Sequence, residues 1–186
     1  QVVIKLQYHT FTDKETREIC FHPYLLKQYN NRWYLIGAAD DDGKILNFAL
    51  DRIDSVTALP EMKYKPCNED LADRFEDIIG VTLYEDRDIE HILFWVSNRS
   101  KDYVGTKPIH GSQCQYKNEK DEEFRRQYPS LNEGAFFSID CIPNYELIRE
   151  LCSFGKDLLV MEPKSIQDDV FHHTQQMYED YLGIRT

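Results

Sequence analysis

Cationic and aromatic side chains occur together in the first part of the sequence, where they could bind an anionic ligand. Guanidinium groups suit phosphate because their planar fork donates two charge-assisted hydrogen bonds at once. Tyrosine rings can stack on nucleic-acid bases, and their hydroxyls can donate hydrogen bonds. The basic or titratable candidates are Arg17, His22, Lys27, Arg32 and Arg52. The aromatic candidates are Tyr8, Tyr24 and Tyr34.

Several of these residues also have a purely structural interpretation. Arg52 either binds the ligand or ties a turn to the neighbouring strands, and Lys27 fits a solvated strand position as well as a ligand contact. Arg17 and His22 are five positions apart, so one regular strand would place them on opposite faces. A bulge or the bend at Pro23 must intervene if both are to reach one ligand.

Two further features, the Trp33–Tyr34 pair and a polar cluster in the second half, can each be interpreted as structural or functional. Trp33 is expected in the core, because a large ring on a central hairpin strand can close a small barrel, and Tyr34 would then point the other way. A polar cluster in the second half either contacts a ligand or stabilises a turn through side-chain hydrogen bonds. Its members are His110, Ser112 and Gln113.

No pattern in the sequence indicates catalysis or metal binding. P-loop, G-x-S-x-G, H-E-x-x-H and G-x-G-x-x-G motifs are absent from it, so neither an enzyme nor a cofactor is expected. The five cysteines are odd in number, widely spaced and without a C-x-x-C pair, which favours reduced cytosolic thiols. His172 and His173 diverge by about 100° on a helix and cannot both face one metal ion.

The first sixty residues read as short strands separated by turn residues, which suggests a small β-barrel. Asn30 and Asn31 tolerate the positive φ of a tight hairpin. Pro23 bends the chain and separates two of the strands. The predicted strands are residues 2–8, 17–22, 24–29, 32–39, 45–50 and 55–59.

The remainder of the chain predicts a linker and then a mixed α/β domain. Residues 61–80 form the linker, with a short helix at about 71–79, between a first domain at 1–60 and a second at 81–186. In the second domain Asn144 is a plausible helix cap, and Pro163 opens a final helix that ends near Leu182. The order strand, helix, strand, strand, helix, strand, helix suits a ferredoxin-like sandwich, with residues 118–129 as a charged helix or hairpin insertion.

The motif RWYLIG at residues 32–37 carries a family resemblance. Together with HPYLLK at 22–27 and LDRI at 50–53, it closely resembles the WYL domain of transcriptional regulators. The second half resembles the WCX extension that often follows a WYL domain. That likeness is carried by PIHGSQ at 108–113, NYEL at 144–147, SFG at 153–155 and VMEP at 160–163.

The resemblance implies an α+β protein, with an Sm- or SH3-like β-barrel followed by a ferredoxin-like domain. It also implies a homodimer and a sensor role, with an anionic effector such as single-stranded DNA or an oligonucleotide. Family members carry an N-terminal winged helix-turn-helix that contacts promoter DNA, and we expect this chain to be a fragment that lacks it. Members often have Arg shortly before LDRI, where this chain has residues 45–49, ILNFA.

The distribution of charge along the sequence indicates which part of the chain can bind such a ligand. The formal net charge of −11 argues against broad, non-specific affinity for nucleic acid. Up to residue 59 the chain has 7 Lys and Arg against 8 Asp and Glu, and the remainder has 15 against 25. An anionic ligand is therefore expected in the first third. With no apolar run of about 18–20 residues and no signal peptide, the protein is expected in the cytoplasm and not in a membrane.

These observations predict the effector-sensing region of a transcriptional regulator. A sensor for a small-molecule metabolite on the same scaffold is the first alternative, favoured by the missing cation near Asn47 and by the acidic second half. A second alternative is a stand-alone accessory or interaction protein. A third is a hydrolase or nuclease in the second half of the chain.

Overall fold

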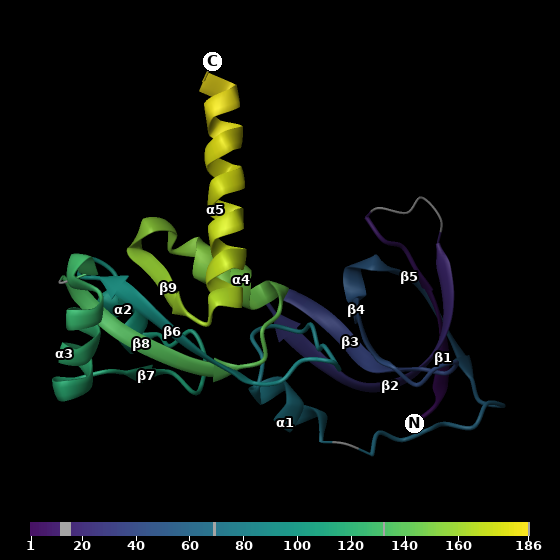
Figure 1. Ribbon diagram of the computed structural model, residues 1–186. Helices are drawn as coiled ribbons and strands as arrows, with labels where there is room; N and C mark the ends of the chain where they lie inside the picture. Colours follow the sequence, from purple (N-terminus) through teal and green to yellow (C-terminus); the bar gives the residue numbers. More distant parts are fainter. Residues whose placement is uncertain (12–15, 69, 132, 186) are drawn as a thin grey trace. The chain divides into compact units, whose positions relative to one another are not determined.

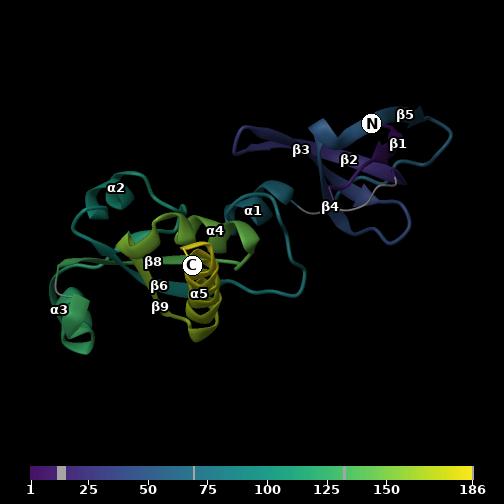
Figure 2. The ribbon, with the colours of Figure 1, turned by 90° about the horizontal axis from the view of Figure 1, so that it is seen from above.

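The computed structural model describes residues 1–11, 16–68, 70–131 and 133–185. The chain divides into two compact units, each with its own antiparallel sheet (Figures 1 and 2). Unit 1 comprises Gln1–Phe75 with Gly80–Leu83, and unit 2 comprises Glu76–Ile79 with Tyr84–Thr186. The expected α+β class is confirmed. Among the helices of these residues, none is long and apolar enough to cross a membrane.

Unit 1 is a curved five-stranded sheet with the strand order β4-β3-β2-β1-β5 (Figure 1). No ladder joins β4 to β5 within the described ranges, so the sheet is open and the closed barrel that we expected is not formed there. The Sm- or SH3-like assignment stays a prediction. The elements are β1 (Val3–Tyr8), β2 (Arg17–Tyr29), β3 (Arg32–Ala39), β4 (Ile45–Ala49), the 3-10 turn η1 (Leu50–Arg52) and β5 (Ile53–Leu59).

The concave side of this sheet holds an aromatic core. Leu6, Tyr8, Phe21 and Phe48 form its buried centre. The Phe48 ring meets Tyr8 and Phe21 edge-on, with centroids 4.8 and 5.0 Å apart, a favourable geometry for aromatic pairs. Gly37 allows the Phe21 ring to lie against the β3 backbone, because an added Cβ would sit 2.8 Å from that ring. The glycine that ends the RWYLIG motif is therefore a packing requirement.

Strand β2 continues through Pro23, so the prediction of two separate strands was wrong. The register between β2 and β3 shifts between Pro23 and Leu25, and this bulge accommodates the residue that has no N–H to donate. The hairpin that follows is confirmed, with φ values of 46° at Asn30 and 61° at Asn31.

Trp33 is not a core residue, which corrects our expectation. It is 48 % exposed, because it lies one position after the start of β3, beside the hairpin and beyond the end of the core. Leu35, the next residue on the same face, packs against the aromatic core instead. After β5 the chain reaches α1 (Leu71–Glu76), which buries Leu71 and Phe75 and is shorter than predicted.

Unit 2 is a four-stranded antiparallel sheet with the order β7-β8-β6-β9 (Figure 1). The sequence of strands and helices follows our expectation, with α3 inserted between β7 and β8, and the ferredoxin-like assignment stays a prediction. The strands are β6 (Glu90–Ser97), β7 (Cys114–Gln115), β8 (Gly134–Cys141) and β9 (Leu158–Glu162). The helices are α2 (Lys101–Thr106), α3 (Asn118–Gln127), α4 (Tyr145–Ser153) and α5 (Lys164–Arg185), with short 3-10 turns η2 (Pro129–Leu131) and η3 (Gly155–Asp157).

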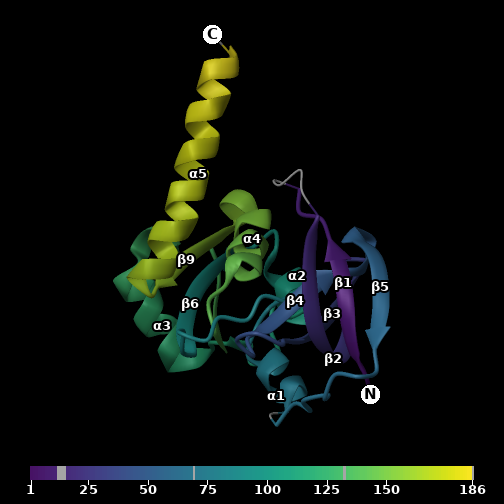
Figure 3. The same cartoon turned by 90° about the vertical axis from the view of Figure 1, so that its right-hand side faces the viewer.

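Helices pack on this sheet through buried apolar side chains. Phe124 of α3 joins Leu93, Trp95 and Phe136 of the strands in one cluster. The predicted cap of α4 is confirmed, since the Asn144 side chain accepts a hydrogen bond from the backbone N–H at the third helical position. Helix α5 packs on β9 and α4 near its start, and its later part extends away from the sheet (Figure 3).

Candidate ligand-binding site

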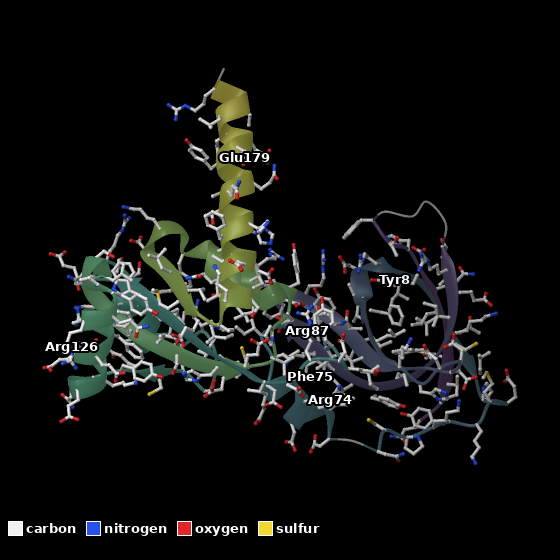
Figure 4. The ribbon with its side chains drawn as sticks, in the orientation of Figure 1. Tyr8, Arg74, Phe75, Arg87, Arg126 and Glu179 are labelled. Atoms are coloured by element: carbon white, nitrogen blue, oxygen red, sulfur yellow. The ribbon has the colours of Figure 1, made fainter. Side chains whose placement is uncertain are left out.

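The candidate site surrounds η1, the turn between β4 and β5. Tyr8 ends β1 and shares the core face with Leu6, so its ring closes one end of the aromatic core (Figure 4). Arg17 begins β2 and is the register partner of Tyr8. On the other side of β1, Tyr8 pairs with Ile53 of β5, directly after Arg52. Three predicted residues, Tyr8, Arg17 and Arg52, therefore lie at one end of the sheet.

Arg52 lies against two aromatic rings. Its guanidinium carbon is 5.0 Å from the centroid of Tyr8 and 4.7 Å from that of Phe11, distances at which a cation is attracted by a ring face. The backbone holds this arrangement, because the His9 N–H donates to the carbonyl of Arg52 over 3.2 Å. Phe11 is 75 % exposed, so one ring of the pair faces solvent.

Two polar atoms of this group are buried and unsatisfied. Among the described residues, neither the Tyr8 hydroxyl nor Arg52 Nε has a hydrogen bond of good geometry, although the hydroxyl lies close enough to Arg52 and to the Ala49 backbone for both to lower its pKa. Burial raises the pKa of Tyr8, and the nearby Arg52 guanidinium opposes that rise. The phenol therefore stays protonated and can donate. Buried donors without partners cost free energy, and a ligand oxygen between them would recover it.

Acidic residues around η1 pair with other cations. Arg32 binds Asp51 over 3.2 Å, and both side chains are exposed. Asp54 accepts from His9 Nδ1 over 3.0 Å. For Arg52 no carboxylate lies within 4.0 Å in the part of the chain that the structure describes. The sequence analysis gave Arg52 either a ligand role or a turn role, and this environment favours the first.

His22 belongs to a different place and is fully buried, which removes it from the predicted ligand set. Its Nδ1 accepts from the backbone N–H of Lys65 over 3.1 Å, so Nε2 carries the proton and donates to Asp40 over 2.9 Å. The bulge in β2 follows His22 and does not precede it, so Arg17 and His22 remain on opposite faces. The structure does not bring these two residues together.

For the remaining predicted residues of unit 1, no contact with Arg52 is found among the described residues. Tyr24 meets the Tyr64 ring edge-on at 6.3 Å, and burial raises its pKa. The Lys27 ammonium lies 4.7 Å from the centroid of Phe75 in α1, where its role is packing. Tyr34 is half-buried on β3, opposite Ala49.

The polar cluster of unit 2 has the hydrogen bonds of a stabilised turn. Ser112 Oγ donates to the Asp140 carbonyl and accepts from the N–H of the same residue, over 2.9 and 2.8 Å. His110 Nδ1 lies 2.8 Å from that hydroxyl. Gln113 accepts from the Ile109 N–H and donates to the Val104 carbonyl, each over 2.9 Å. These contacts support the turn interpretation.

Sequence reasoning missed two members of the candidate site, His9 and Phe11. Their types gave a signal, since both are aromatic and directly follow Tyr8, but they lie beyond the predicted strand. The position near LDRI that lacks the family arginine is structural here, because Asn47 Nδ2 donates to the Val81 carbonyl over 2.9 Å. Within the described ranges no group of three or more His, Cys, Asp or Glu could hold a metal ion.

Comparison with solved structures finds matches that include the following two, and the first of them shows similarity in fold. A CRISPR Cas-related protein aligns over 97 % of this chain and 47 % of its own, with 12 % identity and a TM-score of 0.55. Proteasome accessory factor B/C (PafBC) of Arthrobacter aurescens aligns over 91 % of this chain and 24 % of its own, with 14 % identity and a TM-score of 0.38. The chain thus spans about half or less of the length of each protein. No curated protein matches the chain.

The family comparison concerns the part of the chain that carries the candidate site. The matched residues include Tyr8, Arg17 and Arg52, and they run from β1 almost to the end of β5. Residues 1–58 match the family model of the WYL domain.

Proposed function

We propose that unit 1 senses an anionic effector at η1, and that this effector is single-stranded nucleic acid or a short oligonucleotide. The observation that carries the proposal is the guanidinium of Arg52, held against Tyr8 and Phe11 with no carboxylate within 4.0 Å among the described residues. In a chain with 33 acidic and 22 basic residues, a cation with no carboxylate partner among the described residues is available to an external anion.

The surroundings of Arg52 suit a nucleotide. A phosphate oxygen can accept from the Arg52 guanidinium, and the Tyr8 hydroxyl beside it can donate as well. The exposed ring of Phe11 offers a face for base stacking, which is worth about 1–3 kcal/mol per base and tolerates any base. Arg17 and Arg32 lie on neighbouring elements and can follow the backbone of a longer strand.

Fluorescence anisotropy with short single-stranded DNA and RNA tests this proposal. Arg52→Ala should weaken binding by about 10–100-fold, the effect of losing a charge-assisted hydrogen bond. The dependence of log K on log salt should become shallower by about 0.7, the value for one phosphate contact on a single strand.

Arg149→Ala is the matched control. The Arg149 guanidinium also lies over a tyrosine ring, 5.5 Å from the centroid of Tyr145 in unit 2, and its loss removes the same charge. Binding by this variant should equal that of wild type. Equal affinities for wild type, Arg52→Ala and Arg149→Ala would show that the proposed site is wrong.

A small-molecule metabolite is the second candidate for the same scaffold. It is favoured by Asn47, which uses its amide on the Val81 carbonyl and adds no cation near LDRI. The 25 acidic residues after position 59 also disfavour a long polyanion. Saturable binding of a metabolite that oligonucleotides do not displace would select this alternative.

The regulatory output belongs to the same proposal. We infer that occupancy of the η1 site controls a winged helix-turn-helix elsewhere in the full protein, which would bind promoter DNA in the cytoplasm. The WYL match of residues 1–58 supports this role. An operator-binding assay on the full-length protein, with and without oligonucleotide, would measure the coupling.

A further inference from the structure

A cavity in unit 2 lies between helices α4 and α5 and the segment that precedes β6. Its volume is about 600 Å³, within the range of about 300–1,000 Å³ that is typical of small-molecule sites. All of its lining residues belong to unit 2 and lie outside the WYL match at residues 1–58. None of them belongs to the η1 site, so an inference from this cavity does not depend on the proposed function.

One wall of the cavity is basic. Arg87 lies shortly before β6, and its guanidinium carbon is 4.2 Å from the centroid of the Tyr84 ring. Its Nη1 donates to the carbonyl of Pro143 over 2.9 Å, which places the cation beside the first turn of α4. The N-terminus of a helix carries a partial positive charge that adds to the charge of the guanidinium. This wall is therefore suited to a carboxylate.

The opposite wall is one face of α5, and it offers acceptors. The Asp168 carboxylate is bound by Lys164 over 2.6 Å, whereas no group of the described ranges binds the carboxylate of Asp169. His172 Nδ1 lies 3.1 Å from the carbonyl of Asp168, so Nδ1 carries the proton and leaves Nε2 as an acceptor. At about 100° per residue this face covers an arc of about 140°, and it comprises Asp168, Asp169, His172, His173 and Gln176.

The two opposite charges of the cavity do not pair with each other. In the part of the chain that the structure describes, no carboxylate oxygen lies within 4.0 Å of an Arg87 nitrogen. A simple anion at Arg87 would leave Asp169 unpaired, and a simple amine at Asp169 would leave Arg87 unpaired. A ligand with one carboxylate and one ammonium satisfies both residues through charge-assisted hydrogen bonds.

The lining that α4 contributes is partly apolar. The ring of Tyr145 is 56 % exposed, and Ile148 lies one turn further along the same helix. Covering this surface favours a ligand with apolar side chains. A free amino acid carries both of its charges on one carbon, whereas each added residue lengthens a peptide by up to about 3.5 Å. Charges on two different elements of a cavity of about 600 Å³ therefore favour a short peptide.

We propose that this cavity binds a zwitterionic peptide of two or three apolar residues. Its C-terminal carboxylate accepts from Arg87, and its N-terminal ammonium donates to Asp169 and to Nε2 of His172. Its side chains cover Tyr145 and Ile148. Both ends of the peptide are recognised, so the site discriminates against longer chains and against peptides with a blocked end.

Calorimetric titration of the whole 186-residue chain with leucyl-leucine tests the proposal. Binding should be saturable, with a dissociation constant below about 1 mM. N-acetyl-leucyl-leucine lacks the ammonium and leucyl-leucinamide lacks the carboxylate, so each should bind about 10–100-fold more weakly. Glycyl-glycine keeps both charges but has no side chains, and it should bind at least ~10-fold more weakly.

Two variants assign the ends of the peptide to their walls. Asp169→Asn should weaken leucyl-leucine by about 10–100-fold and leave the N-acetylated peptide unchanged, because that peptide has no ammonium to lose. Arg87→Gln should weaken leucyl-leucine similarly and leave the amide unchanged. The matched controls, Glu179→Gln near the tip of α5 and Arg126→Gln on α3, remove the same charges elsewhere in unit 2 (Figure 4). Both should bind like wild type, and circular dichroism should find all four variants folded, because all four residues are exposed.

Backbone amide shifts locate the bound peptide. Leucyl-leucine should move the signals of Ile148 and Gln176 and leave those around η1 in place. No saturable binding of leucyl-leucine, equal affinity for the blocked peptides, or shifts confined to η1 would each overturn the proposal. Equal weakening of the free and the blocked peptide by Asp169→Asn and by Arg87→Gln would also overturn it, since both residues would then only shape the cavity. None of these results would affect oligonucleotide binding at Arg52, which is measured separately.

Discussion

The backbone N–H of Lys65 donates to Nδ1 of the fully buried His22 over 3.1 Å, although 43 positions separate the two residues. This hydrogen bond fixes the neutral form of the ring with its proton on Nε2, which donates to Asp40. Lys65 also binds Asp40 through its ammonium group over 2.7 Å. The segment after β5 is thereby attached to β2.

Removal of the His22 ring should destabilise unit 1. His22→Ala leaves the Lys65 N–H without its acceptor and opens a cavity, which together cost about 2–4 kcal/mol of the free energy of unfolding. Urea denaturation measures this change. His9→Ala is the control, since His9 is exposed and pairs with Asp54 at the surface, and it should change stability by no more than about 0.5 kcal/mol. Equal losses in the two variants would contradict the role of His22.

The carboxylate of Asp40, which binds both Lys65 and His22, makes the stability of unit 1 depend on pH. Hydrogen bonds from Lys65 and then from His22 hold the pKa of Asp40 below its ordinary value of 3.8. A carboxylate with a lowered folded pKa stabilises the fold above the unfolded pKa, and this contribution is lost as the pH falls through the folded pKa. The urea midpoint should therefore fall below about pH 4 more steeply for wild type than for Asp40→Asn. Lys65→Met should flatten the curve similarly, and parallel curves for all three proteins would refute the assignment.

Local signals predicted much of the fold and only part of the candidate site. The Asn30–Asn31 hairpin and the Asn144 cap follow from the backbone preferences of single residues, so both could be predicted directly from the sequence. The burial of His22 depends on Lys65, a contact that no local pattern encodes. Trp33 was misplaced because its residue type favours the core, whereas its position beside the hairpin decides its exposure.

The association of Tyr8 with Arg52 was partly accessible to sequence reasoning. Both residues were candidates because of their chemistry, but their proximity depends on the pairing of β1 with β5. Phe11 was missed because it follows the strand and has no periodic neighbour. The open sheet likewise reflects pairings between distant segments, which alternation of residue types cannot specify.

Gly37 should be among the least replaceable residues of unit 1. In Gly37→Ala the new Cβ would lie 2.1 Å from the His22 carbonyl oxygen and 2.8 Å from the Phe21 ring, so β2 itself would have to move. We expect a loss of at least ~3 kcal/mol, or failure to fold. Gly105→Ala is the matched control, because nothing lies within 4 Å and α2 is helical there. It should gain about 0.5–1 kcal/mol. Thermal denaturation compares them, and similar melting temperatures would contradict the clash.

The cysteines should differ in reactivity according to burial. Burial raises the pKa of Cys141 to about 12, so at pH 8 its thiolate fraction is on the order of 10⁻⁴. Cys114 is exposed on the short edge strand β7. Mass spectrometry after brief treatment with iodoacetamide should find Cys114 modified and Cys141 intact in the native protein. In urea both should react, because unfolding removes the desolvation of Cys141. Native modification of Cys141 at the rate of Cys114 would show that β8 is not buried as described.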